Sequence, residues 1–525
     1  MTPSEAYSKS DRPSESSEQP EIYGKGDAPL SLGARANKRP WVTGRSARRG
    51  SAPTWRWRAS AAVIAGRLAG ATARRLGRGG GTSLPGLVAR RLDPRIATYL
   101  SAQLRRGSVV ITGTNGKTTT SGLTASVLRA SGARVWRNRE GANLVRGVSA
   151  ALIIRARPSG RLRWGGNAAA VFEVDEAAFP QVVAEIGPRV IVVTNLFRDQ
   201  LDRYGEVDTV AERWRAAIQR LPSPATLALN ADDPAIAVLG EDAGQSRSLF
   251  FGVESLAADS QSEDERVEVI DTRVCPRCRS VLTFSQRFYS HIGHWACGAC
   301  GLSRPRPAVA AREVAQDGLN GTRFVLVTEA GECEVTLPLP GLYNVYNALA
   351  AVAAGLAMDA DLTVIPGALA RFTPAFGRAE RITVEGREIH LLLAKNPTGL
   401  NQVLRALAQA GGRARLLLLL NDHPADGEDV SWIWDADFEQ IAQARPEFLM
   451  AGGARAFDLA LRLKYAGTPA QAVEPDITKA LSLALEHTPA GETLYIAPTY
   501  TALLEARGEL ERQGYAPRYW EQRDV

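Results

Sequence analysis

The chain is long enough for several domains and has the composition of a globular α/β protein. It has 525 residues, of which 45% are hydrophobic, and this excludes a collagen, a wholly disordered chain and a disulfide-dense secreted module. The net charge of +7 is uneven, because residues 1–106 carry 20 Lys and Arg against 7 Asp and Glu, while the remainder is mildly acidic. The charge of the folded part therefore gives no support for nucleic acid as a partner.

The N-terminal region is predicted to contain little packed structure. Residues 1–55 are rich in Ser, Pro, Gly and Arg, which predicts a disordered basic tail, and residues 56–106 are expected to form a helical and linker segment. No secretory signal and no run of 18 apolar residues occurs, so we expect a cytoplasmic protein. The basic stretch from Trp55 to Arg78 permits two interpretations: contact with anionic lipid at the inner face of the plasma membrane, or an ordinary amphipathic helix packed on the next domain.

From Gly107 onward, apolar strand patterns alternate with helical patterns, which predicts a mostly parallel sheet with crossover helices. We expect a central domain over 107–370, interrupted by an insertion at about 252–306, and a C-terminal Rossmann-like α/β domain over 371–525. The strands expected in the central domain are Gly107–Ile111, Ala168–Val174, Val190–Thr194, Thr226–Asn230, Arg323–Val327 and Glu334–Leu337, and the helices are Thr118–Ala130 and Asn344–Leu356. Those expected in the C-terminal domain are the strands Ile389–Leu393, Ala414–Leu420, Phe448–Ala451 and Thr493–Ala497.

A phosphate-binding loop follows the first of these strands. The pattern is G-x-x-x-x-G-K-[ST] with Ile111 in place of the first glycine, and it has the strand before it and the helix after it that this motif requires. Backbone N–H groups of such a loop bind phosphate oxygens, Lys117 bridges the β- and γ-phosphates, and the Thr118 hydroxyl is a ligand for Mg²⁺. The residues predicted to contact ATP here are Gly113, Thr114, Asn115, Gly116, Lys117, Thr118 and Thr119.

Carboxylates follow the next strand of the predicted sheet. Glu173, Asp175 and Glu176 stand at the carboxyl end of Ala168–Val174, where a parallel sheet brings them near the phosphate-binding loop. Glu173 is predicted to be catalytic and to share Mg²⁺ with Thr118. A solvated acidic turn is the alternative. Polar loops end the two following strands on the same edge.

Four of the five cysteines lie in the insertion. Cys275, Cys278, Cys297 and Cys300 form two C-x2-C pairs separated by 18 residues, a spacing that predicts a structural Zn²⁺ ribbon with four thiolate ligands. His291 and His294 lie close enough in sequence to compete as ligands, but we expect both to be exposed loop residues. A closed four-thiolate site leaves no position for water, so its predicted role is structural or in partner contact.

Six motifs in order resemble the Mur ligases, the ATP-dependent amide ligases of peptidoglycan precursors. They are Gly113–Thr120, Glu173–Ala177, Thr194–Asp202, Leu229–Pro234, Gly341–Ala348 and Phe376–Glu380. The resemblance implies an α/β fold with a P-loop central domain, and nucleotide contacts from Asn347, Arg378 and Asn396. The chain departs from the family pattern in three ways: Gln200 replaces a histidine that often supports the metal, the helix expected over Val210–Leu221 has no lysine to serve as the carbamylated metal ligand of many members, and Leu392 stands in place of the acid that would meet the ribose.

Within that family, the closer resemblance is to the MurT branch, the ligase subunits of lipid II isoglutaminyl synthases. The features that carry it are Gly80–Gly86 before the P-loop domain, Asn138–Gly147, the four-cysteine insertion and Ala425–Asp435. The resemblance implies phosphorylation of the D-glutamate α-carboxylate of lipid II and attack by ammonia on the acyl phosphate. It also implies a separate class I glutaminase subunit of the GatD type as the ammonia source.

The loop around Asp426 and Asp429 is predicted to serve that glutaminase, because an aspartate here can orient the partner's catalytic histidine. The alternative is a solvated turn with Trp432 and Trp434 packed on the domain. Two other functions remain open from the sequence: a stand-alone Mur-type or folylpolyglutamate-type ligase that joins an amino acid, and a nucleotide-regulated scaffold that binds a partner through the zinc ribbon.

Overall fold

The computed structural model describes residues 54–75, 83–138, 141–198, 207–258, 272–373, 378–409 and 414–517. The chain divides into the units Met1–Ser51 and Ala52–Val525, and all of the described residues belong to the second unit. The predicted disordered tail lies outside the described residues except at its end, where a helix already begins at Thr54. No helix within the described ranges is long and apolar enough to cross a membrane.

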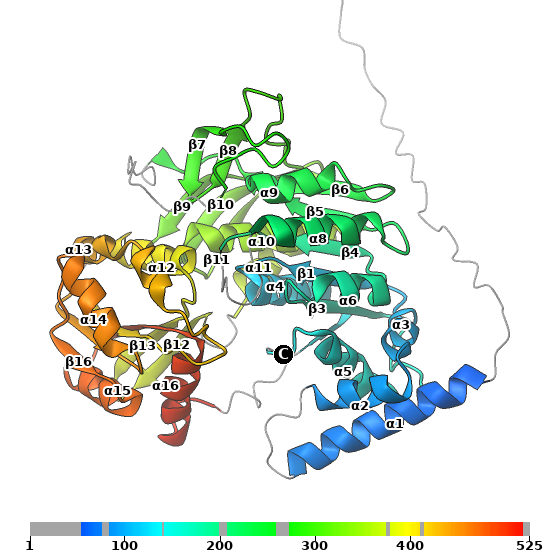
Figure 1. Cartoon of the computed structure of the whole chain (residues 1–525), viewed down its shortest axis with the longest axis horizontal. Helices are drawn as coiled ribbons and strands as arrows, with labels where there is room; N and C mark the ends of the chain where they lie inside the picture. Colours follow the sequence, from blue (N-terminus) through cyan, green and yellow to red (C-terminus); the bar gives the residue numbers. More distant parts are fainter. Residues whose placement is uncertain are drawn as a thin grey trace, which may run out of the picture. The chain divides into compact units, whose positions relative to one another are not determined.

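The larger of the two main sheets has nine strands in the order β11-β10-β9-β6-β5-β4-β1-β3-β2 (Figure 1). Strands β2 to β6 pair in parallel with β1 and with one another, β9 pairs in parallel with β6, and β9, β10 and β11 are antiparallel. The bounds are β1 Ser108–Thr112, β2 Arg134–Arg137, β3 Ala168–Glu173, β4 Val190–Val193, β5 Thr226–Asn230, β6 Arg247–Val253, β9 Val309–Asp317, β10 Gly321–Thr328 and β11 Gly331–Leu337.

Successive side chains of the central strands point to opposite faces of this sheet, because a strand has a period of two residues, and both faces are buried. Val109 and Ile111 of β1 pack with α4 and α10 in one hydrophobic core, whereas Val110 packs with α5, α6 and α8 in another. The helices of this part are α4 Lys117–Ala130, α5 Val145–Arg155, α6 Phe179–Ile186, α8 Val207–Gln219, α9 Pro234–Ala237, α10 Leu342–Ala357 and α11 Ile365–Ala370.

Three N-terminal helices join the second of these cores. They are α1 Thr54–Arg75, α2 Leu84–Leu92 and α3 Ile96–Ser101, and α1 and α2 pack on each other and on α5. Their buried residues include Ala62, Ala89 and Leu100, which share a core with Ile153 of α5. The segment 56–106, expected as helix and linker, thus contains helices that are packed on the central sheet.

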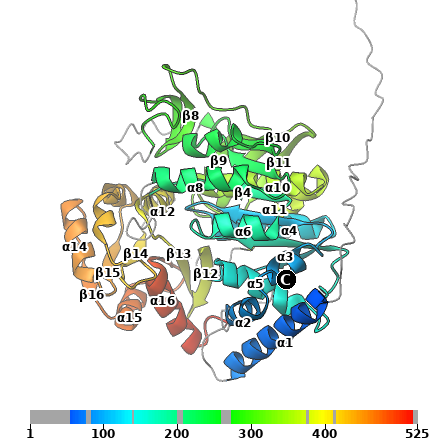
Figure 2. The same cartoon turned by 45° about the vertical axis from the view of Figure 1, so that its right-hand side comes forward.

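The cysteine insertion contains a two-stranded antiparallel sheet, formed by β7 Thr283–Tyr289 and β8 Ile292–Ala296. Both views show this hairpin beside the antiparallel end of the large sheet (Figures 1 and 2). The hairpin packs its Phe288, Tyr289 and Ile292 into the core that contains β9 and α10. The insertion is therefore anchored to the central domain by buried apolar side chains.

The smaller main sheet has six strands in the order β12-β13-β17-β14-β15-β16, and only the β12–β13 pair is antiparallel. Its strands are β12 Arg378–Val384, β13 Arg387–Leu392, β14 Arg415–Leu419, β15 Phe448–Gly452, β16 Ala472–Glu474 and β17 Thr493–Pro498. Helices cover both faces: α12 Pro397–Gln409, α13 Ile441–Ala444, α14 Ala456–Tyr465, α15 Ile477–Glu486 and α16 Tyr500–Arg512. This is the Rossmann-like α/β arrangement that the sequence predicts.

Each of the ten strands and both helices predicted by name corresponds to an observed element, with ends that differ by a few residues. Seven strands of the described residues were not predicted: β2, β6, β7, β8, β9, β12 and β16. β2 and β16 are short strands at the ends of their sheets and lack fully buried runs. β9 and β10 continue the sheet in antiparallel order, which alternation of strands and helices does not predict.

Candidate functional site

The phosphate-binding loop connects β1 to the 14-residue helix α4. Two of its glycines have backbone conformations that side chains rarely adopt, with φ of +131° at Gly113 and +84° at Gly116. A Cβ at Gly113 would lie 2.1 Å from the Thr194 hydroxyl, and one at Gly116 would lie 1.9 Å from Oδ1 of Asn347. Only glycine fits at these two positions, and the helix N-terminus that follows supplies partial positive charge for an anion.

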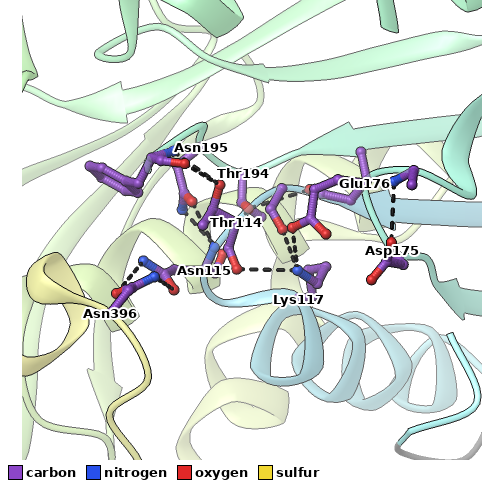
Figure 3. Close-up of polar contacts among 12 residues, drawn as sticks. Thr114, Asn115, Lys117, Asp175, Glu176, Thr194, Asn195 and Asn396 are labelled. Carbon is purple, nitrogen blue, oxygen red and sulfur yellow. Dashed lines mark hydrogen bonds and ion pairs between the residues drawn. The ribbon is translucent and has the colours of Figure 1, made fainter. Parts of the chain in front are cut away.

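Lys117 lies buried in the first turn of α4, where its ammonium group contacts oxygen atoms of the loop and of Glu176. It donates to the carbonyls of Gly113 at 2.6 Å and Thr114 at 3.1 Å, and it forms an ion pair with Oε1 of Glu176 at 2.6 Å (Figure 3). Lys117 and Glu176 are both less than 10% exposed. A buried ion pair of this kind is costly to break by removing one partner, because the other charge remains desolvated.

The end of β4 holds the other side of the loop. The side chain of Asn195 accepts from the backbone N–H of Asn115 at 2.8 Å and donates to its carbonyl at 3.1 Å, and the Thr194 hydroxyl donates to the same carbonyl at 2.8 Å. The Thr114 hydroxyl exchanges hydrogen bonds with the backbone of Phe197 (Figure 3). These contacts fix the loop conformation, which is the preorganisation that phosphate binding requires.

The carboxylates after β3 lie at the same edge as the loop. Glu173 is the last residue of β3, pairs in register with Ile111 of β1 and is half-buried, and its backbone is held by the Asn138 side chain. Glu176 rather than Glu173 contacts Lys117. Thr118 is buried in the first turn of α4. Glu173 thus ends β3 beside the end of β1, Thr118 lies in the helix that follows β1, and Glu176 contacts the neighbouring Lys117.

A cleft opens between the central domain and the C-terminal domain, next to the loop. Asn396 spans it: its Nδ2 donates to Oδ1 of Asn115 at 3.0 Å, and its own Oδ1 accepts from the N–H of Gly399. Asn347 lines the cleft from α10 and accepts from the Thr120 hydroxyl at 3.2 Å. Lys395 also lines it. Two of the three residues that the resemblance implies as nucleotide contacts, Asn347 and Asn396, therefore lie at this cleft beside the phosphate-binding loop.

The cysteine insertion also reaches this cleft. Tyr289, the last residue of β7, lines it and stacks on Phe197 with ring centroids 6.2 Å apart. Next to it, His291 lies 4.8 Å from the Phe197 ring and 3.4 Å from a carboxylate oxygen of Asp233. The prediction that His291 and His294 are exposed was wrong, because β8 packs on the domain: His291 is fully buried, and the half-buried His294 contacts the carbonyl of Val253 at 2.8 Å.

Asp232 joins the insertion to the central domain. Its buried carboxylate accepts from Arg304, from the Tyr346 hydroxyl at 2.6 Å and from the backbone of Val253 at 2.8 Å. Burial raises the pKa of this carboxyl group, and Arg304 acts against that shift. In addition, the Trp295 indole donates to the carbonyl of Ala231 at 3.0 Å. The position of the hairpin, and with it that of Tyr289, therefore depends on a network of buried polar contacts.

The four cysteines of the insertion converge. All four sulfur atoms lie within 4.8 Å of one another, with Cys275 and Cys300 3.7 Å apart and Cys278 and Cys297 3.4 Å apart. Tetrahedral coordination with Zn–S bonds of about 2.3 Å places sulfur atoms about 3.8 Å apart, so the cluster fits Zn²⁺. Cys275 and Cys297 are buried in a small core with Trp295.

The two aspartates predicted to serve a partner have different environments. Asp426 is buried, and its carboxylate accepts from the backbone N–H of Thr501 at 2.8 Å and from the Thr501 hydroxyl, so it caps the first turn of α16. Asp429 is exposed, and a hydrogen bond from the backbone N–H of Ser431 holds its pKa below the usual range. Only Asp429 of this pair has a carboxylate at the surface.

Several predicted positions fall outside the described residues. They include Gln200, all of residues 76–82 and the side chain of Arg378, whose backbone begins β12. Conversely, the roles of Asn195 and Tyr289 were not predicted. Asn195 belongs to a strand-end motif that was recognised as a whole, whereas nothing in the local sequence connects Tyr289 to the phosphate-binding loop.

Two family models match the chain. Residues 111–277 match the Mur ligase middle domain, and residues 393–503 match the MurT ligase C-terminal domain. A pseudomurein peptide ligase type C from Methanothermus fervidus shares the fold, with a TM-score of 0.59 and 24% identity over 79% of this chain and 80% of that chain. The predicted fold class, a Mur ligase α/β fold, is confirmed.

Curated proteins of high similarity include two ligase subunits. The chain is 35% identical over 445 residues to "Lipid II isoglutaminyl synthase (glutamine-hydrolyzing) subunit MurT" of Streptococcus pneumoniae, which covers 85% of this chain and 95% of that protein. It is 34% identical over 452 residues to the protein of the same name from Staphylococcus aureus (strain COL), covering 86% and 97%.

Proposed function

The chain belongs to the family of MurT subunits of lipid II isoglutaminyl synthase, which are ligases, and we propose that it amidates lipid II at the expense of ATP. The proposed acceptor is the α-carboxylate of D-glutamate in the stem peptide, and the product is D-isoglutamine. The observation that carries the proposal is that the phosphate-binding loop, with its Lys117, borders a cleft between two Mur ligase domains.

The proposed chemistry has two steps. A carboxylate is a poor electrophile, so one of its oxygens first attacks the γ-phosphorus of ATP, which forms an acyl phosphate and releases ADP. Ammonia then attacks the acyl carbon, the C–O bond to phosphate breaks, and inorganic phosphate leaves while the nitrogen loses a proton. The amide forms without any oxidation or reduction.

The residues at the loop have distinct proposed roles. The backbone N–H groups of Gly113–Gly116 and the ammonium of Lys117 bind and neutralise the phosphates, and Asn195 keeps the loop in its binding conformation. Thr118 and Glu173 are proposed to hold Mg²⁺, which would neutralise charge on the phosphates. Glu176 orients Lys117 through their ion pair.

The four-cysteine cluster is proposed to hold a structural Zn²⁺. All four thiolates serve as ligands, so the site contributes no catalytic water. Its proposed function is to maintain the ribbon from which the β7–β8 hairpin carries Tyr289 to the cleft.

Tyr289 is expected to contribute to nucleotide affinity. Replacing it with alanine removes an aromatic wall of the cleft, and loss of one base-stacking partner weakens binding about tenfold or more. Isothermal titration with ADP and Mg²⁺ measures the effect. Tyr289→Phe keeps the ring and is the matched control, so equal losses in the two variants, or none in Tyr289→Ala, would contradict this role.

The ammonia is proposed to come from a separate glutaminase subunit. Four of the five cysteines form the metal cluster, and the fifth, Cys333, lies on β11 with a thiol whose pKa is raised by burial. A glutaminase nucleophile requires the opposite shift. The word "subunit" in the names of the two relatives also supports a multi-chain enzyme.

Asp429 is proposed to face that glutaminase and to orient its catalytic histidine. Asp429→Asn is expected to lower glutamine-dependent amidation on the order of a hundredfold or more, because the histidine loses its anionic partner, while amidation with added ammonium persists. Product formation with each nitrogen source, in the presence of the glutaminase, gives the comparison. Asp435→Asn is the control, because Asp435 is also exposed and follows the short 3-10 helix Ser431–Trp434 that comes after Asp429.

Equal losses with glutamine and ammonium would contradict this assignment of Asp429, as would an equal effect of Asp435→Asn. Asp426→Asn is expected to act differently, because it weakens the cap of α16 and so lowers the thermal unfolding temperature.

Mass spectrometry of lipid II tests the proposed function directly. Lipid II is incubated with the chain, ATP, Mg²⁺ and ammonium, and amidation lowers the mass by about 1 Da per stem peptide, with one ADP formed per amide. A gain in mass that requires a supplied amino acid would instead establish an amino-acid ligase. ATP turnover that is independent of any acceptor, with no change in lipid II, would overturn the ligase proposal.

A further inference from the structure

Helix α1 has two apolar faces, and only one of them is covered. On the inner face, small buried residues pack against α2 and α5: Ala59, Ala62, Val63, Gly66 and Ala73. A Cβ at Gly66 would lie 2.6 Å from the carbonyl oxygen of Pro85, so this contact is close. On the other face, Trp57, Ile64 and Leu68 are 64%, 43% and 63% exposed.

These three exposed residues form one stripe. They are separated by seven and four residues, spacings that return to the same side of a helix, and the buried residues lie on the opposite side. Both views show α2 and α5 on one side of α1 and no described element on the other (Figures 1 and 2). The stripe runs over about 17 Å of the helix, at 1.5 Å per residue.

The sequence in which the stripe lies carries charge of one sign. Residues 28–92 contain 14 Lys and Arg and no Asp or Glu. On α1 itself, Arg58 and Arg75 are exposed, and neither α1 nor α2 has an acidic residue in its first turn. Arg67 is engaged elsewhere, because it donates to the carbonyl of Ala156 at 2.6 Å.

An exposed Trp and aliphatic side chains between arginines match the boundary of an anionic membrane, where the ring and the aliphatic groups enter the acyl region and the guanidinium groups stay at the phosphates. A protein partner of complementary charge would meet the arginines as well, but the single sign over 65 residues favours an extended anionic surface. The proposed acceptor is itself a membrane lipid, so the chain is expected to act close to a membrane surface.

We propose that the outward face of α1, formed by Trp57, Ile64 and Leu68 with Arg58 and Arg75, is a docking surface for a membrane that contains anionic phospholipid. Three large apolar side chains give shallow and reversible binding. The proposal does not depend on the ligase function, because vesicle binding requires neither ATP nor acceptor.

Vesicle sedimentation of the full chain tests it. Vesicles of phosphatidylglycerol with phosphatidylcholine are compared with vesicles of phosphatidylcholine alone, and we expect binding to the first that decreases with added salt. The triple variant Trp57→Ser, Ile64→Ser, Leu68→Ser is expected to bind at least about tenfold more weakly. Arg58→Gln and Arg75→Gln are each expected to weaken binding about fivefold at low salt.

The matched control lies on α14, where Phe457 and Leu461 are also exposed apolar residues of a helix, 69% and 49% exposed. Phe457→Ser with Leu461→Ser is expected to leave vesicle binding unchanged. Because every substituted side chain is exposed, the variants should also keep the thermal unfolding temperature of the original chain.

Three outcomes would overturn the proposal. The first is absence of binding to anionic vesicles, or equal loss in the α14 control. The second is a dimer of the original chain that the triple variant abolishes, which would make a second copy the occupant. The third is binding that appears only after residues 1–53 are removed, which would make that segment the cover of the stripe.

Discussion

Replacing Lys117 with methionine is expected to lower the rate of lipid II amidation by about a thousandfold or more. Methionine retains the length and the apolar part of the side chain, so the expected loss reports the ammonium group. That group lies in the first turn of α4, bonded to the loop carbonyls of Gly113 and Thr114. The measurement is the initial rate of product formation by mass spectrometry with saturating ammonium, which removes any dependence on a glutaminase.

Controls for this variant must distinguish the loss of the ammonium charge in catalysis from a loss of folding stability. Lys117→Met leaves the Glu176 carboxylate buried without its partner, which destabilises the chain. Lys117→Met with Glu176→Gln removes both charges, so it is expected to recover the unfolding temperature but not the activity. Lys479→Met, at an exposed lysine of α15, is expected to change neither quantity. A folded double variant with the original rate would show that Lys117 has no part in phosphoryl transfer.

Replacing Cys275 and Cys297 with serine is expected to remove bound zinc and to lower the unfolding temperature by on the order of 10 °C. These two cysteines are the buried members of the cluster, within a small core shared with Trp295 and α9. Because the adjacent hairpin supplies Tyr289 to the cleft, the affinity for ADP should decrease in the same variant. Elemental analysis, thermal unfolding and calorimetric titration measure the three effects.

Cys333→Ser is the matched control for the cluster, since this cysteine lies on β11, outside the metal site. It is expected to keep the zinc content and the affinity for ADP. Retention of one zinc per chain in the Cys275→Ser, Cys297→Ser variant would contradict the four-thiolate site. Loss of zinc with full ADP affinity would show that the hairpin keeps its position without the metal.

Local sequence was sufficient to predict the elements on which the proposed function depends. The phosphate-binding loop depends on glycines between a buried strand and a helix, the four-cysteine cluster on two C-x2-C pairs, and the parallel sheets on alternating apolar strands and helices. In each case the residues that define the feature lie within a few positions of one another, or repeat with the period of a helix or strand. Such short-range patterns can be read without knowing what packs against them.

Contacts between distant segments were decided only by the tertiary structure. Glu176, 59 residues from Lys117, is its ion-pair partner, although Glu173 and Asp175 stand equally near in sequence. Asp426 is buried as the cap of α16, 75 residues away, and His291 is buried beside Asp233. Whether each of these side chains is buried, and which partner it contacts, depends on how the sheet and helices pack. The pattern of neighbouring residues in the sequence does not specify that packing.

The two faces of α1 also differ in a way that the sequence left open and the tertiary structure decided. The sequence determined that this segment is basic, predicted a helical and linker segment over 56–106, and left open whether its apolar residues meet the protein or a membrane. Packing on α2 and α5 covers the small residues and leaves Trp57, Ile64 and Leu68 outside. The physical reason is that the close approach at Gly66 admits only small side chains to the inner face, so the large apolar residues of α1 lie on the outer one.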